Sequence, residues 1–174
     1  MKTKTIIMWV LGTFSLLILF VWIGSKNTTP SNNPNLTTTA STTVEIKNQL
    51  VAPEIFYDFG TISMKNGNVS KIFKVTNSSD KDIFLSSLTT SCMCTKAFFV
   101  LPDGSKRGPF GMPGMGMVPK LNETIKIGES RDVEVVYDPN AHGPAGVGMI
   151  DRFVYLEDSK GEKLQFEIKA VVTP

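Results

Sequence analysis

Two kinds of hydrophobic pattern divide the chain. Residues 6–24 are continuously apolar, with no charged side chain and only Thr13 and Ser15 as hydroxyl residues. From about residue 50 onward, apolar and polar residues alternate in short runs that are separated by turn-forming residues. Alternation with a period of two is typical of β-strands that bury one face. The pattern therefore predicts one long hydrophobic segment, followed by a domain built of strands.

The predicted strands share an enrichment in β-branched and aromatic residues, and clusters of Gly, Asn, Asp and Ser separate them. They cover residues 54–60, 69–77, 82–90, 96–101, 106–111, 122–127, 131–138, 150–157 and 162–172. Alternation is clearest in the last, where Leu164, Phe166, Ile168 and Ala170 should face one way. Since no helical period follows the apolar segment, we expect an all-β fold, an immunoglobulin-like β-sandwich over residues 50–174.

The apolar segment 6–24 has the length of a membrane span. A helix of this length covers roughly 28 Å, close to the thickness of the hydrocarbon core of a bilayer. Lys2 and Lys4 precede the segment, and only Lys26 follows it closely. The positive-inside rule then places residues 1–5 in the cytoplasm and the later residues outside. We expect a single-pass signal anchor in the cell membrane, with a cleaved signal peptide as the alternative.

Residues 25–49 separate the apolar segment from the strands. Ser, Thr, Asn and Pro dominate the stretch 25–44. Such a composition buries too little apolar surface to order itself, so we expect a disordered tether. The formal net charge of +2, with both signs interspersed, argues against a nucleic-acid partner. No motif for a phosphate or another small-molecule substrate is apparent.

The residues with soft or nitrogen donor atoms lie in three short stretches. The chain has two cysteines and one histidine. The candidate donors are Cys92 and Cys94 in "SCMCTK", Met112, Met115 and Met117 in "GPFGMPGMGM", and His142 in "DPNAHGPAGVG". These stretches are rich in glycine and proline or contain turn-forming residues. Whether the pattern reflects a disulfide, a metal site or chance depends on where the fold places them.

Strand register predicts that the three stretches meet. The turn signal "PDGS" at 102–105 predicts a hairpin in which paired residue numbers sum to about 207. Cys94 then lies opposite Pro113, beside the methionine loop. The chain next runs along 122–127, turns and returns along 131–138, so it ends near His142. We expect all the candidate donors at one end of the sandwich.

Several sequence pieces together resemble a bacterial extracytoplasmic family, the domain of unknown function 1573. The pieces are "YDFGTI" (57–62), "FKVTN" (73–77), "TTSCMCTKA" (89–97), "IGES" (127–130) and "VVYDP" (135–139). The resemblance extends over residues 53–172. These domains are similar to immunoglobulin-like modules of the Hydin and abnormal-spindle type. The resemblance implies a fold and an extracytoplasmic location but no activity.

The spacing of the cysteines allows several kinds of chemistry. On an extended strand, Cys92 and Cys94 point to one face, and their Cβ atoms lie too far apart for a relaxed disulfide. The two thiolates could instead bind one soft metal ion. Met93 would point to the opposite face, into the core. A structural disulfide, two buried thiols and a pair that exchanges with a partner thiol remain alternatives.

The choice of metal follows from the thioethers. Methionine sulfur binds Cu(I) well, whereas zinc makes little use of it, although methionines also commonly fill gaps in cores. We therefore predict a copper(I) site formed by Cys92, Cys94, His142, Met112, Met115 and Met117. A Cys94–His142 nucleophile pair lacks an orienting carboxylate and an oxyanion hole, so we expect no enzyme. The alternative is a structural or protein-interaction module, with an extracytoplasmic protein partner, a local disulfide and no metal.

Overall fold

A computed structural model describes residues 50–174. The cytoplasmic N-terminus (1–5), the signal anchor (6–24) and the disordered tether (25–49) predicted from the sequence all lie outside the described residues. Within residues 50–174, no helix has the length and apolar character that crossing a membrane would require.

The described part of the chain consists of strands and two short 3-10 helices. The strands are β1 (Leu50–Val51), β2 (Phe56–Ser63), β3 (Val69–Asn77), β4 (Ile83–Thr90), β5 (Thr95–Val100), β6 (Lys106–Phe110), β7 (Glu123–Ile125), β8 (Ser130–Tyr137), β9 (Gly148–Asp158) and β10 (Lys163–Thr173). The 3-10 helices are η1 (Met64–Asn66) and η2 (Gly143–Gly146). Each strand segment predicted from the sequence overlaps an observed strand, which confirms the all-β prediction.

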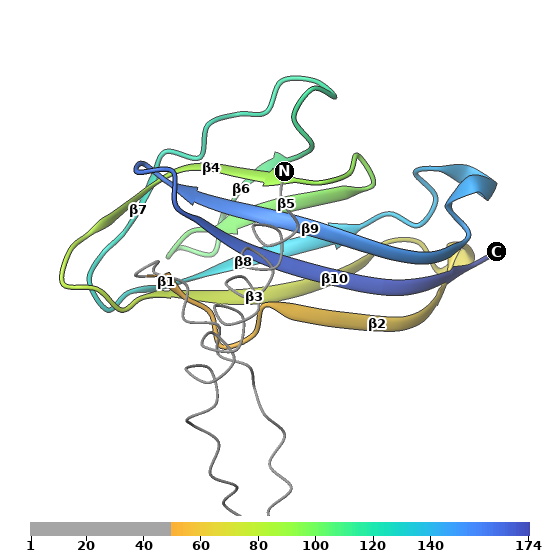
Figure 1. The fold of residues 1–174 in the computed structure, drawn as a ribbon, viewed down its shortest axis with the longest axis horizontal. Coiled ribbons are helices and arrows are strands. Elements are labelled where there is room, and N and C mark those ends of the chain that lie inside the picture. The colour runs from red at the N-terminus through yellow and green to blue at the C-terminus, as the bar shows by residue number, and fades with distance from the viewer. Residues whose placement is uncertain (1–49) are drawn as a thin grey trace, which may run out of the picture. The chain divides into compact units, whose positions relative to one another are not determined.

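The strands form two five-stranded sheets (Figure 1). The strand order is β1-β3-β8-β5-β6 in one sheet and β2-β10-β9-β4-β7 in the other. All neighbouring strands are antiparallel except β2 and β10, which run parallel. β4 and β5 follow each other in the chain but belong to different sheets, so the turn between them crosses from one sheet to the other.

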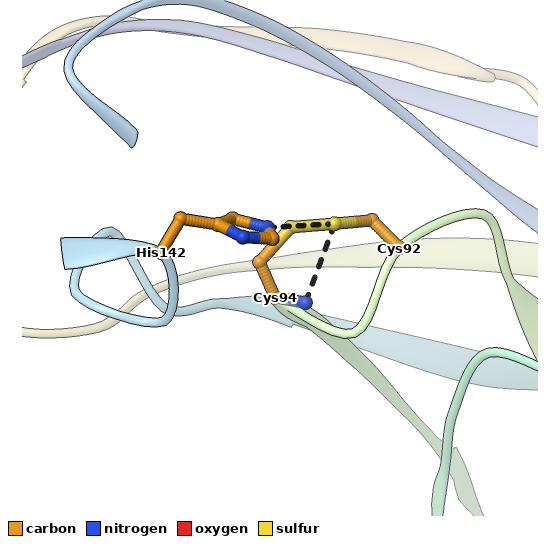
Figure 2. A group of neighbouring side chains, drawn as sticks. All are labelled: Cys92, Cys94 and His142. Atoms are coloured by element: carbon orange, nitrogen blue, oxygen red, sulfur yellow. Dashed lines mark hydrogen bonds between the residues drawn. A yellow bond between two sulfur atoms is a disulfide. The ribbon is translucent and has the colours of Figure 1, made fainter. Parts of the chain in front are cut away.

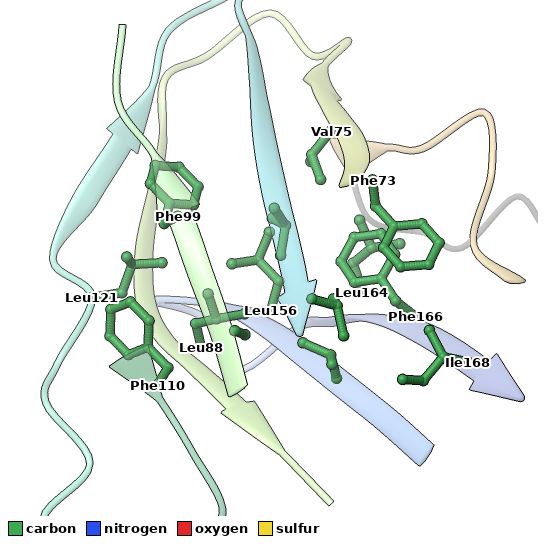
Figure 3. Close-up of a cluster of buried hydrophobic side chains, with 14 of the residues drawn as sticks. Phe73, Val75, Leu88, Phe99, Phe110, Leu121, Leu156, Leu164, Phe166 and Ile168 are labelled. Carbon is green, nitrogen blue, oxygen red and sulfur yellow. The ribbon is translucent and has the colours of Figure 1, made fainter. Parts of the chain in front are cut away.

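The core lies between the sheets and follows the predicted alternation. On β10, the buried residues are Leu164, Phe166, Ile168 and Ala170, which the sequence pattern had placed on one face. Phe166 stacks on Phe73 of the other sheet, with ring centroids 4.8 Å apart (Figure 3). Burial of one such side chain stabilises a fold by about 1.5–3 kcal/mol. The core therefore joins the two sheets along the length of β10.

The hairpin of β5 and β6 has the predicted register. Phe99 pairs with Arg107 and Ala97 with Phe110, so the paired numbers sum to 206 and 207. A glycine is required at Gly108, where φ is +130° and an added Cβ would lie 2.9 Å from the carbonyl oxygen of Ala97. The return strand thus approaches β5 closely and leads the chain back toward the end of β4.

Candidate metal centre

The cysteine pair lies in a tight turn between β4 and β5. The backbone N–H of Thr95 donates a hydrogen bond to the carbonyl oxygen of Cys92 over 3.1 Å, which closes the turn. The buried hydroxyl of Thr90 lies 3.0 Å from the carbonyl oxygen of Cys92 and 3.1 Å from that of Thr95. Ser91 is joined to Phe153 of β9 by two hydrogen bonds of 2.9 Å. The turn is therefore fixed from inside and from the neighbouring strand.

The expectation of an extended strand through the cysteines is wrong. The backbone bends after Cys92, and the Cα atoms of Cys92 and Cys94 lie 5.3 Å apart. This separation is within the usual range for a disulfide, and the structure joins the two sulfur atoms in one. Met93 was expected in the core but is 42% exposed, because the turn interrupts the alternation of the strand. The bend thus permits the disulfide that an extended backbone would disfavour.

The loop after β8 brings His142 to the cysteine turn. The N–H of Asp138 donates to the carbonyl oxygen of Cys94 over 2.8 Å, so the end of β8 is bonded to the turn directly. The Asp138 carboxylate accepts from the N–H of Asn140 over 2.8 Å. The Asn140 side chain donates in turn to the carbonyl oxygen of Met64 over 2.9 Å. These bonds hold the segment that precedes His142 and η2.

His142 lies beside the cysteine sulfur atoms (Figure 2). Its Nε2 atom is 3.2 Å from Sγ of Cys92. Donor atoms of Cys92, Cys94 and His142 all lie within 4.8 Å of one another. Gly146 makes this position available, because an added Cβ there would lie 3.2 Å from Cβ of His142. The structure thus brings together both predicted cysteines and the predicted histidine.

Arg152 of β9 is a neighbour of the cluster that was not predicted from the sequence. Its Nε–H donates to Sγ of Cys94 over 3.2 Å. The charge of Arg152 also acts on Tyr137 of β8. Burial raises the pKa of the Tyr137 hydroxyl, and the positive charge of Arg152 partly opposes that rise. A sequence signal existed, because Arg152 has the same parity on β9 as the buried residues Ile150 and Val154. A charged residue at an inward-facing strand position indicates a partner inside the fold.

The methionine loop runs along the edge of β4. At its start, Gly111 accepts a backbone hydrogen bond from Thr90 over 3.1 Å, and at its end Leu121 donates to Ser86 over 3.1 Å. The loop therefore begins near the cysteine turn and moves away from it along the strand, as Figure 1 also shows. The three methionines are partly to fully exposed: Met112 is 37%, Met115 59% and Met117 98% exposed. Their role as thioether ligands stays a prediction.

The oxidation state of the pair decides what the cluster can do. When reduced, Cys92 and Cys94 offer two thiolates beside the imidazole of His142, a soft donor set. Two thiolates with one monovalent cation leave one negative charge, which the guanidinium of Arg152 offsets. When oxidised, the disulfide removes both thiolates from the donor set. Metal binding and disulfide formation are therefore mutually exclusive at this cluster.

Comparisons with solved structures show the fold. The domain is similar to a protein of unknown function from Porphyromonas gingivalis W83, with a TM-score of 0.50, 16% identity and coverage of 70% of this chain and 46% of that one. Weaker likenesses include the secreted serine protease VesC from Vibrio cholerae, with a TM-score of 0.44, 15% identity and coverage of 72% and 24%. Another is the PapD-like domain 7 of human CEP192, with a TM-score of 0.43, 13% identity and coverage of 84% and 97%. The chain spans less than half the length of the first two.

Sequence comparison matches part of the chain to a family model. No curated protein matches this chain. The model of the family described as "Protein of unknown function (DUF1573)" matches residues 50–101, a range that includes both cysteines. The predicted resemblance is therefore confirmed over residues 50–101, which match the model of this family and lie in a domain of two β-sheets.

Proposed function

We propose that this chain is a membrane-anchored, extracytoplasmic domain that binds Cu(I) when its cysteine pair is reduced. Cys92 and Cys94 supply thiolates and His142 supplies an imidazole nitrogen. The loop methionines Met112, Met115 and Met117 are further candidate ligands. The domain would sequester copper or transfer it to an extracytoplasmic partner.

The observation that carries this proposal is the approach of the histidine to the cysteine pair. The cysteines and the histidine are separated by about fifty residues, yet their donor atoms lie within 4.8 Å of one another. Cu(I) favours thiolate, imidazole and thioether ligands, and it accepts low coordination numbers. Arg152, whose Nε is 3.2 Å from Sγ of Cys94, supplies a compensating charge. The cluster therefore suits a soft monovalent ion better than Mg²⁺ or Ca²⁺, which prefer oxygen ligands.

The test is a competitive Cu(I) titration of the full chain, reduced and kept free of oxygen. Binding should raise the melting temperature, because metal that binds only the folded state stabilises it. Cys92→Ser and Cys94→Ser should each abolish the shift, and His142→Ala should weaken the affinity about tenfold or more. Met149→Leu, which changes an exposed methionine on the outer side of β9, is the matched control. Equal copper binding by the double serine variant and the natural chain would reject the proposal.

The second candidate function is a structural or protein-interaction module without metal. The observation in its favour is the disulfide that joins Cys92 and Cys94. In that case the serine variants should lower the melting temperature of the oxidised chain. His142→Ala should then leave the copper titration unchanged. The two candidates thus differ in whether His142 matters to copper.

The membrane anchor is tested by fractionation. The motivation is the charge-free segment 6–24 and the lysines before it. The full chain should stay with the membranes after a high-salt wash, and external protease should release a fragment that contains residues 50–174. Recovery of a soluble protein that begins near residue 25 without added protease would contradict the anchor and support a cleaved signal peptide.

A further inference from the structure

The two sulfur atoms of the cysteine pair have different surroundings. Cys94 is 1% exposed, whereas Cys92 is partly exposed and precedes the exposed Met93. Sγ of Cys94 accepts from Nε of Arg152 over 3.2 Å and lies 3.7 Å from the hydroxyl of Thr95. The copper proposal uses Arg152 as a compensating charge for the whole donor set, but it does not explain why one cysteine is buried and the other partly exposed.

We propose that the oxidised pair is a site of thiol–disulfide exchange with a cysteine thiol of another molecule. Cys92 is the sulfur that is attacked, and Cys94 is the leaving group. This activity belongs to the metal-free, oxidised form of the domain. It therefore goes beyond the copper proposal and is independent of it.

Access decides which sulfur is attacked. An incoming thiolate must reach the sulfur atom along the direction of the bond that breaks, so a buried sulfur is protected. Cys94 is buried, whereas Cys92 is partly exposed. Figure 2 shows His142 beside the sulfur of Cys92. Attack on Cys92 leaves the negative charge on Cys94.

The leaving sulfur lies where that charge is stabilised. A guanidinium is always positively charged in proteins, and a hydrogen bond from it to an anion is strong. Arg152 donates directly to Sγ of Cys94, so it stabilises the charge that develops there as the disulfide opens. A stabler leaving thiolate makes exchange faster. Access and charge thus favour the same direction of reaction.

The step balances in atoms and electrons. The lone pair of the incoming thiolate forms a bond to Sγ of Cys92, and the electron pair of the Cys92–Cys94 bond leaves on Sγ of Cys94. The second thiolate of the co-reactant then attacks the co-reactant sulfur that is bonded to Cys92. The electron pair of this mixed disulfide bond leaves on Sγ of Cys92. The co-reactant dithiol loses two electrons, the cysteine pair gains them, and the two protons of the co-reactant pass to Cys92 and Cys94.

The experiment mixes the oxidised full chain with a reduced probe peptide in the presence of a metal chelator and follows the opening of the Cys92–Cys94 disulfide. A probe with one cysteine traps the mixed disulfide, and peptide mapping by mass spectrometry identifies the attacked residue. A probe with two cysteines gives the rate of opening. We expect the trapped peptide on Cys92. The folded chain should react about tenfold or more faster than an oxidised synthetic peptide of residues 89–97, which has the same ring but no Arg152.

Two substitutions separate charge from structure. Arg152→Met should slow the opening about tenfold or more, and Arg152→Lys should keep much of the rate because the positive charge remains. Melting curves show whether each variant is folded. Equal trapping on Cys92 and Cys94, an unchanged rate in a folded Arg152→Met variant, or a rate no higher than that of the synthetic peptide would each overturn the proposal.

Discussion

The Nε2 atom of His142 lies 3.2 Å from Sγ of Cys92. His142 directly precedes the 3-10 helix η2, whereas Cys92 belongs to the turn that joins the two sheets. The side chain of His142 makes no capping bond to η2, so its imidazole faces the cysteines instead. Two separate loops therefore meet at one point. The position of the imidazole depends on the backbone of η2 as well as on the cysteine turn.

Gly146→Ala should weaken Cu(I) binding without changing a ligand. The added Cβ would lie 3.2 Å from Cβ of His142, so the histidine has to shift by a few tenths of an ångström. A shift of a few tenths of an ångström in one ligand should lower the affinity several-fold, as disturbed supporting groups commonly do. The measurement is the competitive copper titration.

Gly111→Ala is the matched control for this change. Its added Cβ would meet only the end of the flexible Lys96 side chain, at 3.7 Å. Both variants should keep the melting temperature of the metal-free chain within a few degrees. Undiminished copper affinity in Gly146→Ala would show that the position of His142 does not matter to the metal.

The methionine loop gives a prediction of its own. Simultaneous replacement of Met112, Met115 and Met117 by leucine keeps the apolar volume but removes the thioethers. We expect a weaker Cu(I) affinity and an unchanged melting temperature of the metal-free chain, because the three side chains lie at the surface. Among the single variants, Met112→Leu should lose the most Cu(I) affinity. Met112 directly follows Gly111, whose carbonyl oxygen accepts a hydrogen bond from Thr90 near the cysteine turn. An unchanged affinity in the triple variant would remove the methionines from the site.

The turn between β7 and β8 predicts a pH dependence of stability. Hydrogen bonds from the N–H of Lys126 and from Arg131 lower the pKa of the Glu129 carboxyl from its ordinary value of 4.5. Since the folded state holds the deprotonated form, the stabilisation is present above about pH 4.5 and is lost as the pH falls below that value.

Glu129→Gln should therefore lower the melting temperature at pH 7 and make little difference near pH 2. The control is Glu162→Gln, which changes an exposed carboxylate in the turn between β9 and β10. Thermal melts over a range of pH give the comparison. An equal loss at both pH values would assign the effect of Glu129 to packing and not to charge.

The stacked pair of Phe73 and Phe166 should dominate the stability of the core. Phe166→Ala leaves a cavity between the sheets and should cost about 3–5 kcal/mol in the free energy of unfolding. Ile72→Ala changes a neighbouring but exposed side chain and should cost less than about 1 kcal/mol. Denaturant unfolding measures both. Similar losses for the two variants would contradict the packing described for β10.

Much of the fold was predictable because periodicity and turn signals act locally. The alternation from Leu164 to Ala170 and the hairpin pairing of Phe99 with Arg107 both follow from short stretches of sequence. The two-residue strand β1 was missed, since a pair such as Leu50 and Val51 carries no measurable period. No local pattern in the sequence predicts the assignment of β4 and β5 to different sheets, which depends on long-range packing.

The site was predictable only in part. Strand parity placed His142 at the same end as the cysteines, and the structure has them in contact. The alternation expected of a strand does not hold from Cys92 to Cys94, because the backbone forms a turn there. Met93 is therefore exposed to solvent. Arg152 was missed because its partner is fifty-eight residues away in the sequence. Local patterns gave the candidate donors, whereas the groups that tune them come from distant strands.

The parallel pairing of β2 with β10 gives the domain a mechanical property. The register of this pair runs from Phe56 with Glu167 to Ser63 with Thr173. Tension between the start of β2 and the end of β10 pulls the two strands past each other along their axes. The hydrogen bonds of the ladder then bear the load together, whereas an antiparallel hairpin pulled at its open end breaks them one at a time. A domain with this arrangement resists stretching between these two points.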